Sequence, residues 1–553
     1  MITPHFRGSR REGRLIKRNR LPFILTLVFL LTTSLIASSS SARSSTTEDQ
    51  IKQAYIEAVS DVEQHYAGTY DYNDLNKSGI DGMLHSLDPH SNYMDPKEYA
   101  DFREKQQSQY SGIGATITNR AGQTYILTPF PNAPAERAGL HYGDHVININ
   151  GESSYGWSMA QVSEKMLGPR GTQVKVTVAR PGEKEPLTFN ITRDVVPLPS
   201  ITVIKMVSPN VGYIHLEKAF NFTTADELRN ALDTLKAKGA TSYILDLREN
   251  PGGLLNEALE VLDDFLGRGN KLLSVHGRRS EDLPPQDIYA HNSRPDQSPL
   301  IVLINRDSAS ASEIVAGALQ DHDRAWIVGE NSFGKGLVQT PFQLPGDAGL
   351  YLTTGKYLTP SGRLIQRDYS KIPFWTYILM ERNGAAPPTE QGPSFTTDNG
   401  RQVYGGGGIT PDTEVKSQLL TDAQIRLLTP QFMFTRQLIN GQIAGLESYK
   451  YSGPKHESIV NKDDLPVSDA VLTAFEAFVK AHPEYGVSVK MAQNNREYVR
   501  QRIRFDLANA VYGVDAAEQI LMENDPVIEA ALKQMPQAAK LASAIAQRSV
   551  GMK

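Results

Sequence analysis

Short apolar segments alternate with helical ones between Val211 and Val328, and this alternation limits the fold more than any other feature of the sequence. The strand-like segments are Val211–Leu216, Ser242–Leu247, Leu300–Ile304 and Ala325–Val328, and the helical ones are Thr224–Lys238, Leu255–Leu266 and Ser312–Gln320. Strands that alternate with helices form a mainly parallel sheet with its chemistry at the carboxyl edge. We therefore expect an α/β core: a mixed, largely parallel sheet with flanking helices.

The segments before and after this core have other patterns. Short β-rich runs separated by Gly, Pro and Asn turns lie at Ala115–Ile117, Tyr125–Leu127, His145–Ile149 and Val174–Val178, with a helix at Ser158–Met166. We expect helices at Leu75–Leu87 and Pro96–Gln109, and a mostly helical chain from Thr421 onward. Residues 367–405 are polar and rich in Pro and Gly, which indicates an irregular surface insertion.

These patterns divide the chain into five parts. They are a leader or anchor (1–43), a helical region (44–108), a β-rich domain (109–197), the α/β core with its insertion (198–418), and a C-terminal helical region (419–553).

The N-terminus carries an export pattern. Residues 1–20 hold seven basic residues and one acid, and an uncharged, mostly apolar run from Leu21 to Ala37 follows. This is typical of a secretory signal or a single membrane anchor. We expect an exported protein in the periplasm or another extracytoplasmic compartment, either released by cleavage near Ala42 or held at the inner membrane.

Charge and composition exclude several functions. The net charge of the chain is −5, although residues 1–20 alone carry a charge of +6. The rest of the chain is therefore strongly acidic, and we expect no nucleic-acid partner. The 553-residue chain has no cysteine, which rules out disulfides and thiolate chemistry. No spacing of His and carboxylate residues is typical of a metal site.

Ser310 lies where a strand gives way to a helix, in the run Ser308-Ala309-Ser310-Ala311-Ser312-Glu313. The amino end of a helix offers free N–H groups and partial positive charge, which favour an oxyanion. However, Ser310-x-x-Glu313 is also the pattern of a capping box, in which the serine only caps the helix. These residues alone leave both interpretations open.

Lys335 stands between two glycines, with Gln339 one helical turn beyond it. A buried lysine can lose its charge and serve as the base that a serine nucleophile requires. Residues 329–335 also match most of a phosphate-binding loop, but Gly336 replaces the hydroxyl residue that binds magnesium. A solvated loop lysine is the third interpretation.

Two glycine segments offer backbone N–H groups. Gly252 and Gly253 follow the strand-like Ser242–Leu247, where an amide could approach a substrate and act with that of Ala311 as an oxyanion hole. Gly112, Ile113 and Gly114 open the β-rich domain. Such a loop can hold the terminal carboxylate of a peptide that adds as an extra strand.

Histidines offer a rival base. His322 lies between two aspartates at the far end of the predicted Ser312–Gln320 helix, about 15 Å from Ser310 by helix geometry. His90 belongs to a turn and has no evident partner. A Ser/His/Asp triad is therefore the less favoured arrangement.

Together these segments resemble the carboxyl-terminal processing proteases, which are tail-specific serine peptidases of the S41 type. The likeness covers roughly residues 50–415. Its motifs are Leu87–Ser91, Tyr110–Gly114, Ala133–Leu140, Gly168–Thr172, Asp246–Gly253, Ser308–Asp321, Phe333–Gln339, Tyr357–Arg363 and Gly408–Asp412.

The resemblance implies a role for each candidate residue. Ser310 corresponds to the nucleophile, Lys335 to the general base and Gln339 to the residue that orients the lysine. The N–H groups of Ala311 and of Gly252 or Gly253 correspond to the oxyanion donors, and residues 109–197 to a PDZ domain that captures tails. It implies a serine endopeptidase that needs no cofactor and acts on proteins or peptides with unstructured, apolar C-termini.

Two residues depart from the family pattern. Asp307 stands where glycine is usual, and an acid there would disfavour an oxyanion or alter the turn. Leu167 stands where many relatives have an arginine linked to PDZ control of activity, with Arg170 as a nearby substitute. The alternative function is a non-catalytic PDZ scaffold with a decayed protease core. The helices after residue 419 are expected to mediate either homodimerisation or adaptor docking.

Overall fold

The computed structural model describes residues 47–278, 286–370, 372–382, 392–451, 453–455, 460–461 and 463–551. The predicted leader, residues 1–43, lies outside this range. No helix within the described ranges is long and apolar enough to cross a bilayer. The chain divides into two compact units, residues 1–76 and 77–553. The first contains α2 (Glu48–His65), which begins with a capping box at Thr47 and has no buried residue; α3 (Tyr72–His85) spans the division.

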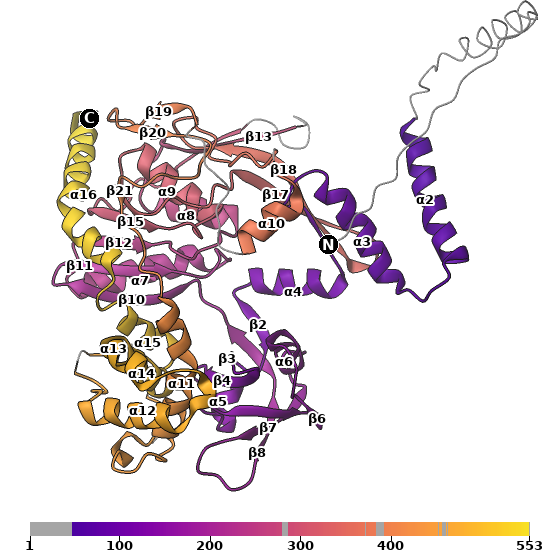
Figure 1. Cartoon of the computed structure of the whole chain (residues 1–553). Helices are drawn as coiled ribbons and strands as arrows, with labels where there is room; N and C mark the ends of the chain where they lie inside the picture. The colour runs from indigo at the N-terminus through magenta and orange to yellow at the C-terminus, as the bar shows by residue number, and fades with distance from the viewer. Residues whose placement is uncertain are drawn as a thin grey trace, which may run out of the picture. The chain divides into compact units, whose positions relative to one another are not determined.

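A six-stranded sheet forms the centre of the larger unit (Figure 1). Its order is β10-β11-β12-β15-β16-β21, and all neighbours are parallel except β10 and β11. The strands are β10 (Ile201–Ser208), β11 (Val211–Leu216), β12 (Ser242–Asp246), β15 (Leu300–Ile304), β16 (Trp326–Gly329) and β21 (Thr413–Glu414). The predicted mixed, largely parallel α/β core is confirmed.

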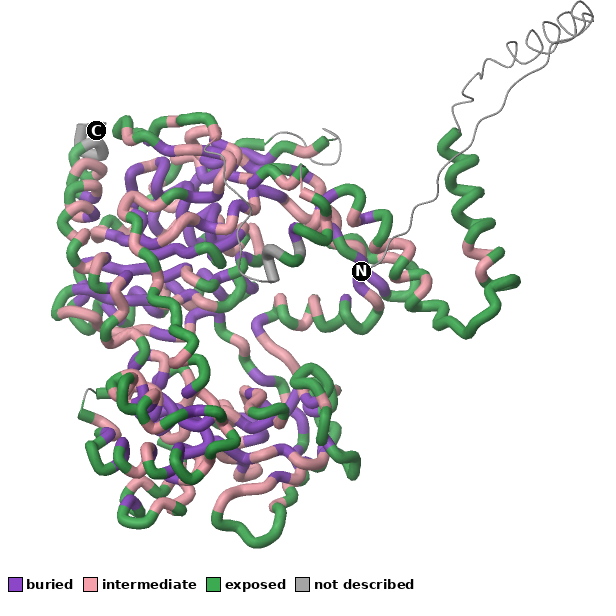
Figure 2. The backbone as a smooth tube through the Cα atoms, viewed as in Figure 1, coloured by how far each residue is buried: buried purple, intermediate pink, exposed green. Residues whose placement is uncertain are grey.

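Helices cover both faces of this sheet. One face packs against α7 (Thr224–Ala237), α8 (Leu255–Asp263) and α9 (Ala311–Asp321). The other packs against the final helix, α16 (Pro526–Gly551). Every residue of β12 and β15 is consequently buried, which explains their nearly continuous apolar sequences (Figure 2).

A second, antiparallel sheet belongs to the same unit. Its path is β1-β18-β13-β14, and β17 also pairs with β18. The strands are β1 (Asn92–Met94), β13 (Lys271–Gly277), β14 (Gln286–Tyr289), β17 (Leu337–Gln343) and β18 (Gly349–Leu358), with a 3-10 turn η1 at Pro345–Asp347. The helix α4 (Pro96–Gln106) follows β1.

The β-rich domain is a separate antiparallel sheet of order β3-β4-β5-β7-β8, with β6 paired to β5. β2 and β9, the first and last strands of the domain in sequence, pair with each other in a separate two-strand ribbon. The elements are β2 (Gln109–Gly112), β3 (Ala115–Arg120), β4 (Gln123–Pro129), α5 (Pro134–Ala138), β5 (His145–Ile149), β6 (Glu152–Ser153), α6 (Met159–Met166), β7 (Gln173–Ala179), β8 (Leu187–Thr192) and β9 (Asp194–Pro197).

The C-terminal helical region packs against the β-rich domain. Tyr125 and Tyr142 of that domain join an apolar cluster with Phe432 and other residues of the C-terminal helices. Arg436 donates a 2.6 Å hydrogen bond to the Ala179 carbonyl. The elements are α11 (Asp422–Ile439), α12 (Asp469–Ala481), α13 (Val489–Asn494), α14 (Arg496–Tyr512) and α15 (Val514–Leu521), with 3-10 turns η2 (Glu447–Tyr449) and η3 (Pro483–Tyr485).

The predicted irregular character of residues 367–405 is wrong. This insertion contains α10 (Phe374–Arg382), β19 (Ser394–Thr396) and β20 (Gln402–Tyr404), and the two strands pair with each other. Tyr377 and Val403 are buried. Tyr377, an aromatic residue that the polar composition obscured, therefore packs against the rest of the unit.

Candidate active site

Ser310 occupies the turn between β15 and α9, as the strand-to-helix pattern predicts. It is the N-cap of α9 and has φ 53° and ψ −110°. A positive φ is strained for a residue with a side chain, and such strain persists only when the surroundings enforce it. The turn is held against the loop after β12, since the Ala309 N–H donates to the Asn250 carbonyl at 3.0 Å. Two parallel strands thus bring their following loops together at the carboxyl edge.

Glu313 fastens the serine turn to the lysine loop. Its carboxylate accepts backbone N–H groups from Ser310 at 2.9 Å, Gly334 at 2.7 Å and Lys335 at 2.8 Å. It also accepts the Ser332 hydroxyl at 2.5 Å. Burial raises the pKa of this carboxyl, while its hydrogen bonds lower it. Glu313 is therefore more than a helix cap: it fixes the spacing of the two catalytic candidates.

Lys335 and Gln339 come together, but not through a helix. Lys335 lies in the loop before β17 and Gln339 lies in that strand, so the expected helical turn is wrong. The register between β17 and β18 shifts between Val338 and Gln339, a bulge of the kind that re-aims a side chain. Lys335 Nζ donates to Gln339 Oε1 at 2.5 Å, and Gln339 Nε2 donates to the His90 carbonyl at 2.6 Å.

Tyr357 of β18 also joins the same two segments. Its hydroxyl lies 2.7 Å from the Lys335 carbonyl and 3.1 Å from the Ser310 carbonyl. The ring is fully buried, which raises the pKa of its hydroxyl well above the ordinary value. A neutral phenol thus bridges the backbones of the serine and the lysine.

The two glycines after β12 lie against the nucleophile. A Cβ placed on Gly252 would stand 2.8 Å from Ser310 Cβ and 3.0 Å from the Ala311 nitrogen. The Gly252 N–H donates to Asn250 Oδ1 at 2.8 Å, which commits it to the turn. Gly253 has φ 140°, and its Cβ would meet the Phe220 backbone at 2.3 Å. Only glycines allow this close approach.

A cavity of about 510 Å³ opens over these groups. Ser310, Ala311, Gly253 and Gln339 all line it. Its wall is otherwise largely apolar: Phe102, Leu198, Phe220, Leu254, Leu255, Ile314, Leu337, Val338, Pro341 and Tyr351 contribute. The predicted nucleophile and two predicted amide donors thus face one apolar pocket large enough for side chains of a peptide.

Comparison with known proteins gives the family. The profile of peptidase family S41 matches residues 210–371, and that of the PDZ domain matches residues 125–180. A carboxy-terminal-processing protease of Bartonella bacilliformis is 38% identical over 352 residues, which cover 62% of this chain and 79% of that protein. The chain is an S41 carboxy-terminal processing protease.

A second curated relative gives the same family. The carboxy-terminal processing protease CtpA of Bacillus subtilis is 33% identical over 363 residues, covering 63% of this chain and 76% of that protein. Among solved structures, a photosystem II D1 C-terminal processing protease is 26% identical over 71% of this chain and 94% of its own, with a TM-score of 0.36. The resemblance read from the motifs is confirmed.

The PDZ domain of this S41 protease presents the predicted glycine loop. Gly114 has φ 73°, and a Cβ there would stand 2.4 Å from that of Ala133. The side chain of Ile113 is buried in the domain core. Among the described strands β3, which follows the loop, pairs only with β4, so its other edge lies open beside α6.

The two departures from the family pattern have structural explanations. Asp307 donates its backbone N–H to Asn305 Oδ1, and its half-exposed carboxylate lies 3.5 Å from Arg306. It does not line the cavity. Leu167 lies against Gly112, where a Cβ would come within 3.1 Å of it, and Arg170 forms a 2.9 Å ion pair with Asp194.

The alternative sites find less support in the geometry. The N–H groups of Gly334 and Lys335, which a nucleotide phosphate would require, donate instead to Glu313. His322 lies at the other end of α9, 2.9 Å from Asp398 and 2.7 Å from the Lys271 carbonyl. Both of its ring nitrogens are thus engaged away from Ser310.

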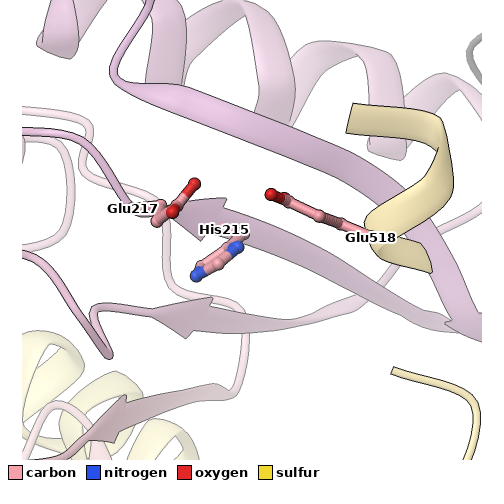
Figure 3. Close-up of side chains that lie close together, drawn as sticks. All are labelled: His215, Glu217 and Glu518. Carbon is pink, nitrogen blue, oxygen red and sulfur yellow. The ribbon is translucent and has the colours of Figure 1, made fainter. Parts of the chain in front are cut away.

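The tertiary structure also gathers three potential metal ligands that no sequence spacing suggested. His215, Glu217 and Glu518 approach one another within 4.8 Å, between β11 and α15 (Figure 3). Burial, with Glu217 and Asp515 nearby, raises the pKa of Glu518 to about 8. Lys218 forms a 2.8 Å ion pair with Glu217. The three side chains are candidate metal ligands, and the carboxylate of Glu217 is also paired with Lys218.

Proposed function

We propose that this S41 protease is an exported endopeptidase in which Ser310 is the nucleophile, Lys335 the general base and Gln339 the residue that orients the lysine. The observation that carries the proposal is the shared support of both catalytic candidates. Glu313 accepts the backbone N–H groups of Ser310 and Lys335, and the Tyr357 hydroxyl lies within hydrogen-bonding distance of the carbonyls of the same two residues. Such rigid support is what an activated nucleophile requires.

The proposed acylation step follows from these positions. The neutral amine of Lys335 takes the proton from Ser310 Oγ as the oxygen attacks the scissile carbonyl carbon. The N–H groups of Ala311 and Gly253 stabilise the oxyanion. Because the Gly252 N–H is committed to Asn250, we assign the second donor to Gly253. The lysine ammonium then protonates the leaving amine as the C–N bond breaks.

Deacylation reverses the roles. The amine of Lys335, neutral again, takes a proton from a water molecule that attacks the ester carbonyl. The ammonium returns this proton to Ser310 Oγ as the ester bond breaks, and the peptide leaves with a new terminal carboxylate. The enzyme is restored without a metal or nucleotide taking part in any step.

The substrate class follows from the cavity and the PDZ loop. The apolar lining near Ser310 fits apolar side chains next to the scissile bond. We propose that Gly112, Ile113 and Gly114 hold the terminal carboxylate of an unstructured tail, which then pairs with the open edge of β3. Anisotropy should show that a labelled peptide with a free apolar C-terminus binds at least about tenfold tighter than its C-terminal amide.

Peptide hydrolysis tests the chemistry. We expect the wild type to cleave a peptide with an apolar C-terminus, and Ser310→Ala or Lys335→Ala to lower kcat by about 10³-fold or more. Folding of each variant is checked by thermal melting. Substantial cleavage by Lys335→Ala would show that the lysine is not the base, and a wild type without activity would favour the decayed scaffold.

Export is tested separately. The basic and apolar N-terminal segment supports a proposal of periplasmic or extracytoplasmic location, with residues 1–43 as signal or anchor. Cell fractionation and N-terminal sequencing of the recovered protein distinguish cleavage near Ala42 from retention at the inner membrane. Recovery of uncleaved chain in the cytoplasm would refute it.

A further inference from the structure

His90 occupies an unusual place behind the catalytic lysine. Its carbonyl accepts the Gln339 amide N–H, and its ring is close enough to Lys335 for the ammonium charge to disfavour protonation of the imidazole. The ring nitrogen Nε2 is buried and has no hydrogen-bond partner within the described part of the chain. Such an orphaned polar atom calls for an explanation.

The turn that carries His90 is rigid. The carboxylate of Asp88 accepts the N–H of His90 at 2.8 Å, the N–H of Ser91 at 2.7 Å and the hydroxyl of Ser91 at 2.8 Å. Because the His90 carbonyl is thereby fixed, the Gln339 amide must direct Nε2 to it and Oε1 to the lysine. Because Gln339 Oε1 accepts a hydrogen bond from the Lys335 amine, one N–H of the amine points to the glutamine. The nitrogen lone pair of the neutral amine then points in another direction.

Aromatic rings enclose the imidazole. Phe333, Tyr369 and Tyr377 meet it edge-to-face, with centroids 6.5, 5.9 and 5.7 Å away. Two of these three rings belong to residues 367–405, the insertion that the core family pattern does not explain. Burial and the charge of Lys335 lower the pKa of His90 to about 4.

The start of the insertion also holds the lysine loop. The Arg367 N–H donates to the Gly334 carbonyl at 2.9 Å, and the Arg367 guanidinium donates to the Ser332 carbonyl at 2.9 Å. The Gly336 N–H donates to Gln366 Oε1 at 2.8 Å. Arg367, the first residue of the insertion, and Gln366 just before it therefore both contact the catalytic loop.

We propose that the insertion is a positioning element for the catalytic lysine: Tyr369 and Tyr377 enclose a neutral His90 ring, and this enclosure shields the Lys335–Gln339 pair from water. The inference rests on the proposed function, because it assigns the insertion an effect on the base. A dry surrounding disfavours the ammonium form, which keeps the amine ready to accept a proton.

Among the described residues, the charged groups that act on the His90 ring come from the elements just described. Asp88 on its own turn favours the imidazolium and Lys335 on the catalytic loop opposes it. Burial raises the pKa of the Tyr369 phenol, which keeps it neutral. Water admitted to the enclosure would raise the pKa of His90 toward its ordinary value of 6.5. The same water would favour the ammonium form of Lys335.

Tyr377→Ala tests the proposal, with Tyr377→Phe as the conservative partner. We expect Tyr377→Ala to move the acid limb of kcat/KM to higher pH by about one unit, an approximately tenfold loss on that limb. Tyr377→Phe keeps the ring and should retain the wild-type profile. Trp375→Ala on the same helix is the matched control, because Trp375 is 70% exposed.

NMR titration of labelled histidines gives a readout that does not depend on activity. His90→Phe identifies the His90 signal by its loss. We expect this signal to titrate near pH 4 in the wild type and at least one unit higher in Tyr377→Ala. A wild-type His90 that titrates at an ordinary pH would overturn the inference.

The outcomes separate this inference from the proposed function. A wild type whose rate shows no acid limb argues against lysine as the base. A wild type with that limb, together with a Tyr377→Ala variant that exposes His90 but keeps the limb in place, refutes the positioning role alone. If Tyr377→Ala does not fold, His90→Ala and His90→Phe make the same comparison. We expect the acid limb of kcat/KM to shift in His90→Ala and to stay in place in His90→Phe.

Discussion

Two fully buried carboxylates, Glu313 and Asp506, organise two regions in different ways. Glu313 accepts donors separated from it by 3 to 22 residues, all from the serine turn and the lysine loop. Asp506 of α14 accepts the Gln431 amide of α11, 75 residues away. Burial raises the pKa of both carboxyls. One fixes a reaction centre, whereas the other fixes the packing of helices behind the PDZ domain.

This difference shows which tertiary contacts a sequence motif can predict. The donors to Glu313 lie within one short stretch of chain, so the catalytic region leaves a compact signature. The surroundings of Asp506 join segments hundreds of residues apart; the neighbouring Asn509, for example, contacts Thr128 of the PDZ domain. No local pattern encodes such a contact. Substitutions at Gly252, Glu313 and Asp506 test how separate the two regions are.

Gly252→Ala should have the largest effect on activity. The added Cβ would stand 2.7 Å from the Ala309 carbonyl and displace the Ser310 turn, so we expect a loss of kcat of about 10³-fold. Gly269→Ala is the matched control: Gly269 has a similar φ of 88°, but no atom lies within 4 Å of the new Cβ. Equal losses in both variants would trace the effect to backbone strain and not to the nucleophile.

Glu313→Gln should lower kcat by about 10²-fold and stability by about 2 kcal/mol. An amide presents an NH₂ group where the carboxylate accepts N–H donors, so at least one donor among Ser310, Gly334 and Lys335 loses its partner. Steady-state kinetics and denaturant melts measure the two effects. If Glu313→Gln were as active as Asp506→Asn, the functional distinction between the two carboxylates would fail.

Asp506→Ala should affect stability but not peptide hydrolysis. Removal of the buried carboxylate leaves the Gln431 amide without its acceptor, at a cost of about 1–3 kcal/mol. Hydrogen exchange should rise in α11 and α14, while kcat for a short peptide stays at the wild-type value. A matching fall in kcat would instead couple the C-terminal helices to the chemistry.

Glu518→Gln should have the smallest effect, and one that depends on pH. The pKa of Glu518 is about 8 against an ordinary 4.5, so between these values the folded chain keeps a proton that the unfolded chain has released. The group therefore destabilises the fold increasingly as pH rises through this window. Relative to wild type, the variant should gain stability in denaturant melts near pH 9 and almost none near pH 4. An equal gain at both pH values would contradict the raised pKa.

The strand and helix pattern was largely readable from the sequence. The predicted bounds of Val211–Leu216 and Leu300–Ile304 coincide with β11 and β15, because strands buried on both faces are continuous apolar runs. The geometry around Lys335 was less accessible. Its spacing from Gln339 suggested a helix, but pairing with β18 made the segment a strand, and a bulge re-aimed the glutamine.

Residues of the candidate site that the sequence did not single out act through tertiary contacts. Tyr357 bridges two carbonyls, and Asn250 orders the glycine loop through its side chain. His90 had no evident partner in the sequence because its surroundings come from segments more than 240 residues later. The fixed order of the motifs could have suggested that these segments meet, but not which atoms do.

The sequence by itself determined the family, the α/β core and the residues proposed for catalysis, because apolar periodicity and a compact set of motifs are local properties of the chain. Only the tertiary structure decided how the insertion encloses His90, which glycine N–H remains available, and how the C-terminal helices pack on the PDZ domain. Those features depend on burial and hydrogen bonding between distant segments, and such interactions exist only once the chain has folded.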